Sequence, residues 1–363
     1  MRRRALTLLA LAAVTACAAE APAPDDPSTS TSTPSATPAT PAPTTSAPPP
    51  SAPRPRPFTL AVAGDVHFEG PLRARLDDPA TALAPATRAL AAADVAMVNL
   101  ETSVGTGGAP EPGKRFLFEA PASAFAALGA AGVDVVTMAN NHVLDFGRGR
   151  LRSTFAAISA GPVDVVGIGR DADEAFAPAV LDVDGTSVAV LGATTAGADP
   201  TADPTGQWAA TDDRPGTADA LDPARLLAAV RDADRGADVV VAYLHWGVQG
   251  ERCPDDRQRS LARRLVEAGA DVVVGSHTHG LQGDGRLGPG YVAYGLGNYA
   301  WYTGSDTAVL TLTVRPPATP SGRARVTRAA WEPARTGPDG LPTAVPRAGF
   351  DAEIASLRSC AGF

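Results

Sequence analysis

The chain has 363 residues, a formal net charge of −8 at pH 7 and only five histidines. No basic run follows the arginines of the first four positions, so the charge balance excludes a nucleic-acid-binding protein. The residues from 58 onward are numerous enough for one large α/β domain or two small ones.

The first seventeen residues predict an export signal. Three arginines precede an apolar run from Ala5 to Val14, which is far shorter than the ~20 residues of a membrane-spanning helix. The end of this segment resembles a bacterial lipobox, in which Cys17 carries the lipid; the alternative is an ordinary secretory peptide with an incidental cysteine. Either interpretation places the protein outside the cytoplasm, and the first anchors it as a lipoprotein to the outer face of the cell membrane.

Residues 18–57 consist almost entirely of Ala, Pro, Ser and Thr, with no aromatic side chain. Such a segment buries too little apolar surface to offset the entropy of ordering it, which predicts a disordered, extended stalk. Residues 58–363 then form the folded domain, and lipid, stalk and domain together describe a tethered protein.

Short strands and Ala/Leu-rich helices alternate through the first half of this domain. Strands are predicted at 58–65, 94–101, 134–142 and 163–169, and helices at 80–93, 120–132 and 150–160. The segment 178–194 predicts a β-hairpin that turns at Asp184-Gly185.

The second half begins with a loop at 196–220, which has little periodicity and is a candidate rim or lid. Helices at 222–234 and 257–269 then alternate with strands at 237–247 and 270–280, and the tail predicts strands at 291–301, 307–315 and 323–333 without helices between them. Continuously apolar strands are typical of sheets buried on both faces, whereas the late strands alternate. The pattern therefore predicts an α/β fold with a mixed or two-sheet core covered by helices.

Every histidine lies at the carboxyl end of a predicted strand, near a carboxylate, an amide or a second imidazole. The clusters are Asp65 with His67, Asn99 with Glu101, Asn140 with Asn141 and His142, His245 with Trp246, and His277 with His279. Ligands bind at this edge of open α/β sheets. In Asp-x-His and His-x-His both side chains project from the same side of an extended backbone, so both can reach one small volume.

Imidazoles, carboxylates and an amide oxygen suit Zn, Fe or Mn better than Ca. Seven such side chains exceed the roughly four to six ligands of one ion and favour two ions that share a carboxylate, an arrangement used in phosphoester hydrolysis. Taken singly, each histidine has a structural alternative as a hydrogen-bonded residue, Asn140-Asn141 as a turn and Trp246 as a packing residue. The coincidence of all five histidines favours the metal site.

The order D-x-H, carboxylate, N-H, H and H-x-H resembles the calcineurin-like metallophosphoesterase superfamily. More closely, six blocks resemble the CapA-type proteins of poly-γ-glutamate capsule synthesis: GDVHFEG, VNLETSV, MANNHVLDFG, HWGVQ, GSHTHGLQ and YGLGNY. They extend from Gly64 to Tyr299. The resemblance implies a metallophosphatase-like, four-layer α-β-β-α sandwich with mixed sheets.

The resemblance also implies a set of ligands for two divalent transition metal ions (Mn, Fe or Zn). One ion would be held by Asp65, His67 and His279, and the other by Asn141, His245 and His277. Glu101 would bridge the two ions, at a position where phosphoesterases usually have Asp.

By the same resemblance, His142 would be the general acid that protonates the leaving group, oriented by Asp145. The residues expected to line the pocket are Asn99, Asn140, Trp246, Gly295, Asn298 and Tyr299. The last metal motif has Ser276 before His277, which fits the CapA-type pattern better than the phosphoesterase one.

Apart from Cys17, the chain has two cysteines, Cys253 and Cys360. In an oxidising compartment they form a disulfide or remain two free thiols. The sequence gives no distance between them and leaves both alternatives open.

Two functions follow from the resemblance. The first is a lipid-anchored hydrolase with two metal ions that cleaves a phosphoester or related bond in capsule or cell-wall polymer metabolism, and the completeness of the ligand sets and of His142 favours it. The second is a non-catalytic metal-binding protein that assists export or anchoring of an anionic capsular polymer. The expected partners are the membrane, through the lipid, and an anionic envelope polymer or a phosphoester substrate; no oligomeric state is predicted.

Overall fold

The computed structural model describes residues 56–363 with the exception of residues 85 and 320–321. These residues belong to one compact unit, Pro53–Phe363. The predicted signal peptide with Cys17 and nearly all of the predicted stalk lie outside the described residues. Within the described ranges, none of the helices has the length and apolar character needed to cross a membrane.

The larger of two main sheets has the strand order β18-β17-β16-β1-β2-β5-β6, with β15 beside β1. Its central strand β1 runs parallel to β2 and β15 and antiparallel to β16, so the sheet is mixed. The strands are β1 (Phe58–Val66), β2 (Val95–Leu100), β5 (Val135–Thr137), β6 (Asp164–Val166), β15 (Asn298–Ala300), β16 (Asp306–Arg315), β17 (Arg325–Thr336) and β18 (Pro342–Ala344).

The smaller main sheet has the order β13-β14-β12-β11-β9-β8 and is also mixed. Its strands are β8 (Ala179–Val183), β9 (Thr186–Thr194), β11 (Val239–His245), β12 (Val272–Ser276), β13 (Asp284–Leu287) and β14 (Gly290–Ala293). The predicted hairpin is confirmed, because β8 pairs antiparallel with β9. Asp184 and Gly185 have φ of 50° and 83°, as a tight two-residue hairpin turn requires.

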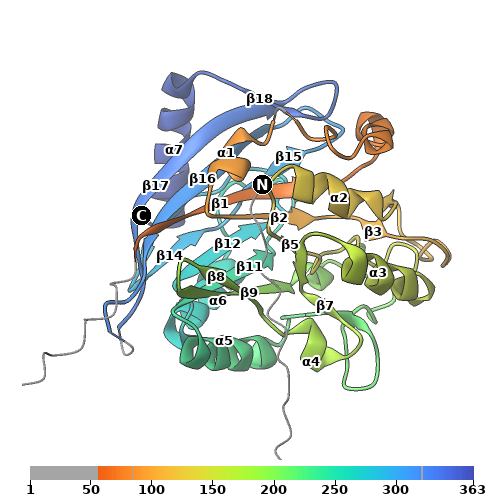
Figure 1. The fold of residues 1–363 in the computed structure, drawn as a ribbon, viewed down its shortest axis with the longest axis horizontal. Coiled ribbons are helices and arrows are strands. Elements are labelled where there is room, and N and C mark those ends of the chain that lie inside the picture. Colours follow the sequence, from red (N-terminus) through yellow and green to blue (C-terminus); the bar gives the residue numbers. More distant parts are fainter. Residues whose placement is uncertain (1–55, 85, 320–321) are drawn as a thin grey trace, which may run out of the picture. The chain divides into compact units, whose positions relative to one another are not determined.

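Seven α-helices, three short 3₁₀-helices (Gly70–Leu72, Ala74–Asp77 and Ala196–Ala198) and two small strand pairs complete the described part of the fold (Figure 1). The helices are α1 (Arg88–Ala92), α2 (Ser123–Ala130), α3 (Arg148–Ala160), α4 (Ala172–Ala175), α5 (Ala224–Gly236), α6 (Asp256–Ala268) and α7 (Arg347–Ala361). The small pairs join β3 (Ser103–Val104) to β4 (Glu119–Ala120), and β7 (Ile168–Gly169) to β10 (Gly216–Thr217).

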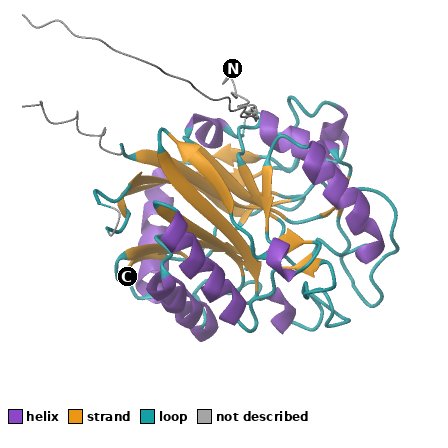
Figure 2. Cartoon of the chain, turned by 60° about the horizontal axis from the view of Figure 1, so that its bottom comes forward, coloured by secondary structure: helices purple, strands orange, loops and turns teal. Residues whose placement is uncertain are grey.

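The two main sheets pack face to face, and helices cover their outer faces (Figure 2). Along β1, Leu60 and Val62 face the core between the sheets, whereas Ala61 and Ala63 face the layer that contains α1, α2 and α3. β11 alternates in the same way, and its outer side chains pack under α5 and α6. This period of two is that of strands buried on both faces. The α/β class and the α-β-β-α sandwich with mixed sheets are confirmed.

Several predicted elements were wrong in extent. The helix predicted at 80–93 is reduced to Arg88–Ala92 after a series of turns, in a segment where Pro79 and Pro85 lack the N–H that a helix needs. The strand predicted at 163–169 divides into β6 and β7, which belong to different sheets; Gly167 between them has φ of 84°. The tail segment 291–301 divides likewise into β14 and β15.

Helix α7 was not predicted at all. Its Phe350, Ile354 and Leu357 follow the i, i+4, i+7 spacing of one helix face and pack into the core between the sheets. At its end Cys360 forms a disulfide with Cys253, with Cα atoms 5.6 Å apart. The carboxyl-terminal helix is thereby fixed to the segment that follows β11.

Candidate metal centre

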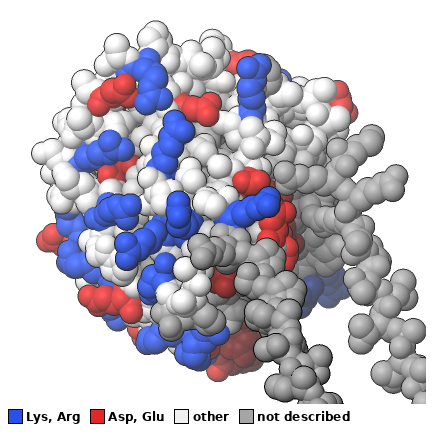
Figure 3. Space-filling model, turned by 60° about the vertical axis from the view of Figure 1, so that its left-hand side comes forward, with Lys and Arg blue, Asp and Glu red and all other residues white. Residues whose placement is uncertain are grey.

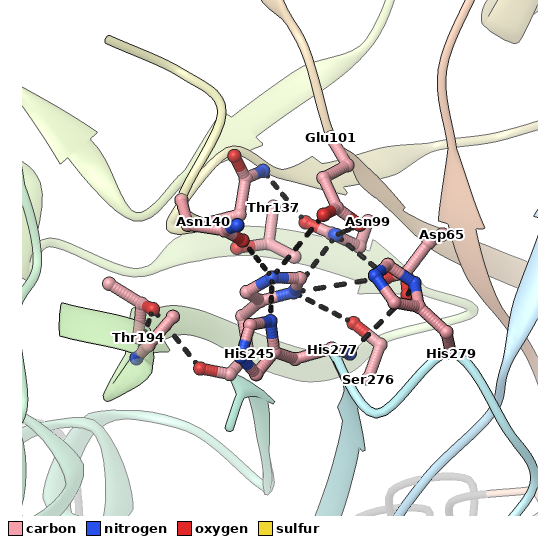
Figure 4. A network of polar contacts seen from close by, with 12 residues as sticks. Asp65, Asn99, Glu101, Thr137, Asn140, Thr194, His245, Ser276, His277 and His279 are labelled. Carbon is pink, nitrogen blue, oxygen red and sulfur yellow. Dashed lines mark hydrogen bonds and ion pairs between the residues drawn. The ribbon is translucent and has the colours of Figure 1, made fainter. Parts of the chain in front are cut away.

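The candidate site lies where the carboxyl ends of strands from both main sheets meet (Figure 4). β1, β2 and β5 of the larger sheet lead into Asp65, Glu101 and the segment 140–142. β11 and β12 of the smaller sheet lead into His245, His277 and His279. The sheets are joined beside the site by a hydrogen bond from the Tyr243 hydroxyl to the carbonyl of Ala63, at 2.9 Å. The candidate residues therefore meet at the carboxyl ends of strands, as predicted, but these strands belong to two sheets.

Asp65, Glu101 and His279 form one cluster. Each offers a ligand atom, and these three atoms lie within 4.8 Å of one another. Asp65 is placed by a close backbone approach: its N–H donates to the carbonyl of Gly297 at 2.9 Å, and a Cβ on the preceding Gly64 would lie 1.7 Å from the same oxygen. Only glycine at position 64 permits this approach.

Asn141, His245 and His277 form the neighbouring cluster. The Nε2 atom of His245 lies 2.7 Å from Oδ1 of Asn141 and 3.0 Å from Nδ1 of His277. The Nδ1 atom of His245 lies 3.1 Å from the Ser276 hydroxyl. The three side chains that were predicted to hold the second ion are thus brought together.

The predicted extended His-x-His segment is wrong. β12 ends at Ser276, and both His277 and His279 have positive φ, 94° and 58°. Non-glycine residues adopt this region at a cost, and such strain is concentrated at functional sites. The turn aims the backbone N–H of His277 at Oδ2 of Asp65, 3.3 Å away, and directs the two imidazoles into different clusters.

Glu101 lies between the two clusters and is fully buried. Its Oε1 atom is 3.7 Å from Nε2 of His245 and 3.7 Å from Nε2 of His142, and among the described residues it has no hydrogen-bond partner. Burial, and then the charge of Asp65, raise the pKa of Glu101 well above its usual value. A buried carboxylate oxygen without a partner, surrounded by nitrogen ligands, is an environment that a divalent cation would complete.

Burial also determines the charge of the histidines. It is the largest cause lowering the pKa of His67, His245, His277 and His142, to about 3 for His277 and about 4 for His142. Their imidazoles are therefore neutral at pH 7, which is the form that binds metal ions. The donor set fits divalent transition metals, as expected.

His142 is held from two sides. Its Nδ1 atom is 2.6 Å from Oδ2 of Asp145, which also accepts a hydrogen bond from the Phe118 N–H at 2.6 Å. The imidazole stacks on the Phe118 ring with centroids 4.0 Å apart. The backbone N–H of His142 donates to Oδ1 of Asn140 at 3.0 Å. Nδ1 is thus occupied, and Nε2 faces Glu101.

His67 lies apart from both clusters. It is buried beside Phe118 and Trp301, with ring centroids 4.8 and 4.1 Å away. Its Nδ1 atom accepts a hydrogen bond from the Glu69 N–H at 2.9 Å. The Tyr302 N–H lies 3.5 Å from Nε2, so both ring nitrogens face backbone donors in this orientation, and the ligand role of His67 stays a prediction.

The predicted pocket residues divide into two kinds. Asn99, Asn140 and Asn298 contact site residues: Asn99 donates to Asp65 at 2.8 Å, Asn140 donates to Asn99 at 3.0 Å, and Oδ1 of Asn298 lies 2.7 Å from Nδ1 of His279. These amides orient the candidate ligands.

The other kind supports the surrounding structure. Trp246 packs against Gly275 and donates from Nε1 to the Tyr294 carbonyl at 2.8 Å, and Tyr299 donates to the Ala86 carbonyl at 2.7 Å. Gly295 leaves room for the side chain of Gln282.

A cavity of ≈ 800 Å³ opens beside His277. Trp246, Asp199, Arg257 and Arg264 are among its lining residues, which come from the segments before α5 and around the start of α6. It is large enough for the part of a substrate that extends beyond the reacting group.

Sequence reasoning missed Lys114. Its Nζ atom lies 2.5 Å from Oδ1 of Asp145 and donates to the backbone carbonyl of Asn141. The available signal was that it is the only lysine among 363 residues.

A family model described as bacterial capsule synthesis protein PGA_cap matches residues 59–302. The capsule biosynthesis protein CapA of Bacillus anthracis is 34% identical over 196 residues, 51% of this chain and 45% of that protein. The PGA biosynthesis protein CapA of Bacillus subtilis (strain 168) is 33% identical over 199 residues, 53% of this chain and 50% of that protein. The chain thus spans about half the length of the curated relatives it matches. The solved structure of a novel phosphatase from Mycoplasma pneumoniae aligns with a TM-score of 0.47 and 12% identity, over 81% of this chain and 96% of that one.

Proposed function

Because the chain belongs to the bacterial capsule synthesis protein PGA_cap family, we propose that it is a metal-dependent hydrolase of the cell envelope that acts in capsule or cell-wall polymer metabolism. The proposed substrate is a phosphoester or a related bond in an anionic polymer. The observation that carries the proposal is the buried, unpartnered oxygen of Glu101 between two clusters of candidate ligands.

In this proposal Asp65 and His279 would hold one ion, Asn141, His245 and His277 would hold the other, and Glu101 would be available to both. When bound, the ions would supply Lewis acidity that polarises the scissile group and activates the attacking water. Asn99, Asn140 and Asn298 keep the ligand side chains oriented.

His142 would exchange a proton with the leaving oxygen through Nε2. Asp145 holds Nδ1 at 2.6 Å, so the ring presents Nε2 in one direction. The cavity beside His277 would receive the adjoining part of the polymer.

Glu101→Gln should stabilise the metal-free protein and impair metal binding and activity. In the metal-free protein it removes a buried carboxyl group whose raised pKa costs stability at pH 7, so we expect the free energy of unfolding to rise by about 1–3 kcal/mol. In the presence of Mn²⁺, Zn²⁺ or Fe²⁺ we expect metal content to fall from about two ions per chain, and hydrolysis of phosphomonoesters and phosphodiesters to be lost. Denaturant unfolding, elemental analysis and an ester panel measure these changes.

His142→Ala and Glu332→Gln complete the experiment. His142→Ala should abolish turnover and keep the metal content, and Glu332→Gln, which changes an exposed acid, should alter nothing. Wild-type protein that binds no transition metal would contradict the proposed centre.

Non-catalytic assistance to polymer export or anchoring is the second candidate function. Two observations favour it. The pKa of about 4 leaves His142 without the proton that a general acid donates. Basic side chains gather on the left-hand side of the domain as it is seen in Figure 1 (Figure 3), and β17, on that side, carries the exposed Arg325 and Arg328. Metal binding without turnover of any ester would place this function first.

Attachment to the outer face of the membrane through a lipid on Cys17 is part of the proposal. It rests on the composition of residues 1–17. Mass spectrometry of the mature amino terminus measures it directly, and a mature terminus without acyl chains would contradict it.

A further inference from the structure

Lys114 is buried inside the candidate centre, with only 3% of its side chain exposed. It approaches the site from the segment that connects β3 to β4. Burial of a lysine opposes its charge and costs side-chain entropy, so a buried lysine requires specific partners. We propose that Lys114 is a positioning residue that fixes His142 and Asn141 relative to each other. This inference rests on the proposed function of the centre.

Two of its contacts converge on one short stretch of chain. The Nζ atom lies 2.5 Å from Oδ1 of Asp145, the carboxylate whose other oxygen holds Nδ1 of His142 at 2.6 Å. Nζ also donates to the backbone carbonyl of Asn141. That carbonyl belongs to the peptide unit that joins Asn141, a candidate metal ligand, to His142, the candidate proton donor.

The geometry gives Lys114 more than the role of a counter-ion. A counter-ion for Asp145 would need only the carboxylate contact, whereas the ammonium group also holds the peptide unit from which both functional side chains project. The side chain of Asn141 reaches His245 at 2.7 Å in one direction, and the ring of His142 faces Glu101 in the other. Lys114 therefore connects the ligand side of the centre to the proton-transfer side.

Lys114 is itself held from the segment 196–220. Its ammonium lies over the Trp208 ring, 4.2 Å from the centroid, and the Trp208 indole donates to Oε1 of Glu111 at 3.2 Å. The backbone N–H of Glu111 donates to the carbonyl of Asp145 at 2.8 Å. Trp208 is almost fully buried, so this part of the predicted rim or lid is packed against the centre.

Lys114→Met and Lys114→Gln remove the charge, and Lys114→Arg keeps it. Arg115→Met is the matched control, since it removes an exposed charge from the neighbouring position. In the full-length chain titrated with Mn²⁺ alone, we expect both uncharged variants to lose about 10- to 100-fold in metal affinity. With an ester substrate we expect kcat to fall about 100-fold while KM changes little, and Lys114→Arg to restore part of the loss.

The ¹⁵N spectrum of His142 in the metal-free, full-length chain is the readout that a purely structural role would not change. In wild type we expect one fixed tautomer with the proton on Nδ1, and in the uncharged variants an averaged signal. If Lys114→Met does not fold, the same measurements are made on Lys114→Gln.

Uncharged variants with wild-type Mn²⁺ affinity and an unchanged His142 spectrum would overturn the inference. If the wild type turns over no ester, the proposed hydrolase function fails, while the affinity and the spectrum still decide the role of Lys114. Any effect of Arg115→Met equal to that of Lys114→Met would also contradict it, because the loss would then follow from charge alone.

Discussion

At the scale of single residues, the centre combines groups whose burial changes the pKa in opposite directions. The pKa values of Asp65 and Glu101 are raised by burial, and those of the neighbouring histidines are lowered. Both shifts favour the neutral form of each side chain in the metal-free protein. The stability of that protein therefore contains opposed dependences on pH.

The contribution of His142 to this pH dependence can be measured separately. Its folded pKa of about 4 lies below the ordinary 6.5, so between these values the unfolded chain binds a proton that the folded chain does not. As the pH falls from about 6.5 to about 4, metal-free wild type should lose up to about 3 kcal/mol of stability relative to His142→Asn. Urea unfolding of both proteins across this range measures the difference. A difference that stays constant, or grows in favour of wild type in acid, would refute the shifted pKa.

The candidate ligands were predictable from the sequence because metal-binding residue types are distinctive and all five histidines lie at the carboxyl ends of predicted strands. The orientation of each side chain was not. His67 occurs in the expected D-x-H motif, yet its ring is held by the Glu69 N–H and by neighbouring aromatic rings. Lys114 lies 31 positions before Asp145, in a segment without periodicity, and only the folded structure brings the two together.

At the scale of elements, the centre depends on the approach of β1 to the turn that precedes β15. Gly64→Ala would place a Cβ 1.7 Å from the Gly297 carbonyl oxygen, so the two segments must separate. We expect a loss of about 1–3 kcal/mol in stability and a weaker metal affinity, because Asp65 and Asn298 are carried on the separated segments. Thermal unfolding and metal titration measure both.

Gly236→Ala is the control for this substitution. In the described structure nothing lies within 4 Å of a Cβ at that position, which is the last residue of α5. It should leave metal affinity unchanged and alter stability by less than about 1 kcal/mol. Equal effects of the two substitutions would mean that the close approach at Gly64 is not what positions Asp65.

Elements with a strong local pattern were predictable, and those defined by distant contacts were not. The β8–β9 hairpin was predictable because its turn needs residues that tolerate positive φ. Helix α7 was missed because its buried face has only three large apolar side chains, and it is stabilised by packing between sheets formed far away in the chain.

At the scale of the whole molecule, the Cys253–Cys360 disulfide closes a loop of 107 residues that contains β12, β15 and the last two histidines. Removing it with Cys253→Ser and Cys360→Ser should reduce the free energy of unfolding by about 2–4 kcal/mol, chiefly by freeing the unfolded chain. Urea unfolding with and without a reductant measures this, since the reductant should affect wild type and not the double variant. If wild type and the double variant are equally stable without reductant, Cys253 and Cys360 are two free thiols in solution.

The division of the centre between two sheets has a consequence for how the protein matures. Asp65 and His277 are 212 positions apart and meet only when the sheets have docked. Before docking, the candidate ligands are divided between the sheets: Asp65, Glu101 and Asn141 lie at or after strands of the larger sheet, and His245, His277 and His279 at or after strands of the smaller one. The complete set of candidate ligands therefore exists only in the docked structure, and we expect metal affinity and tertiary structure to appear together during refolding.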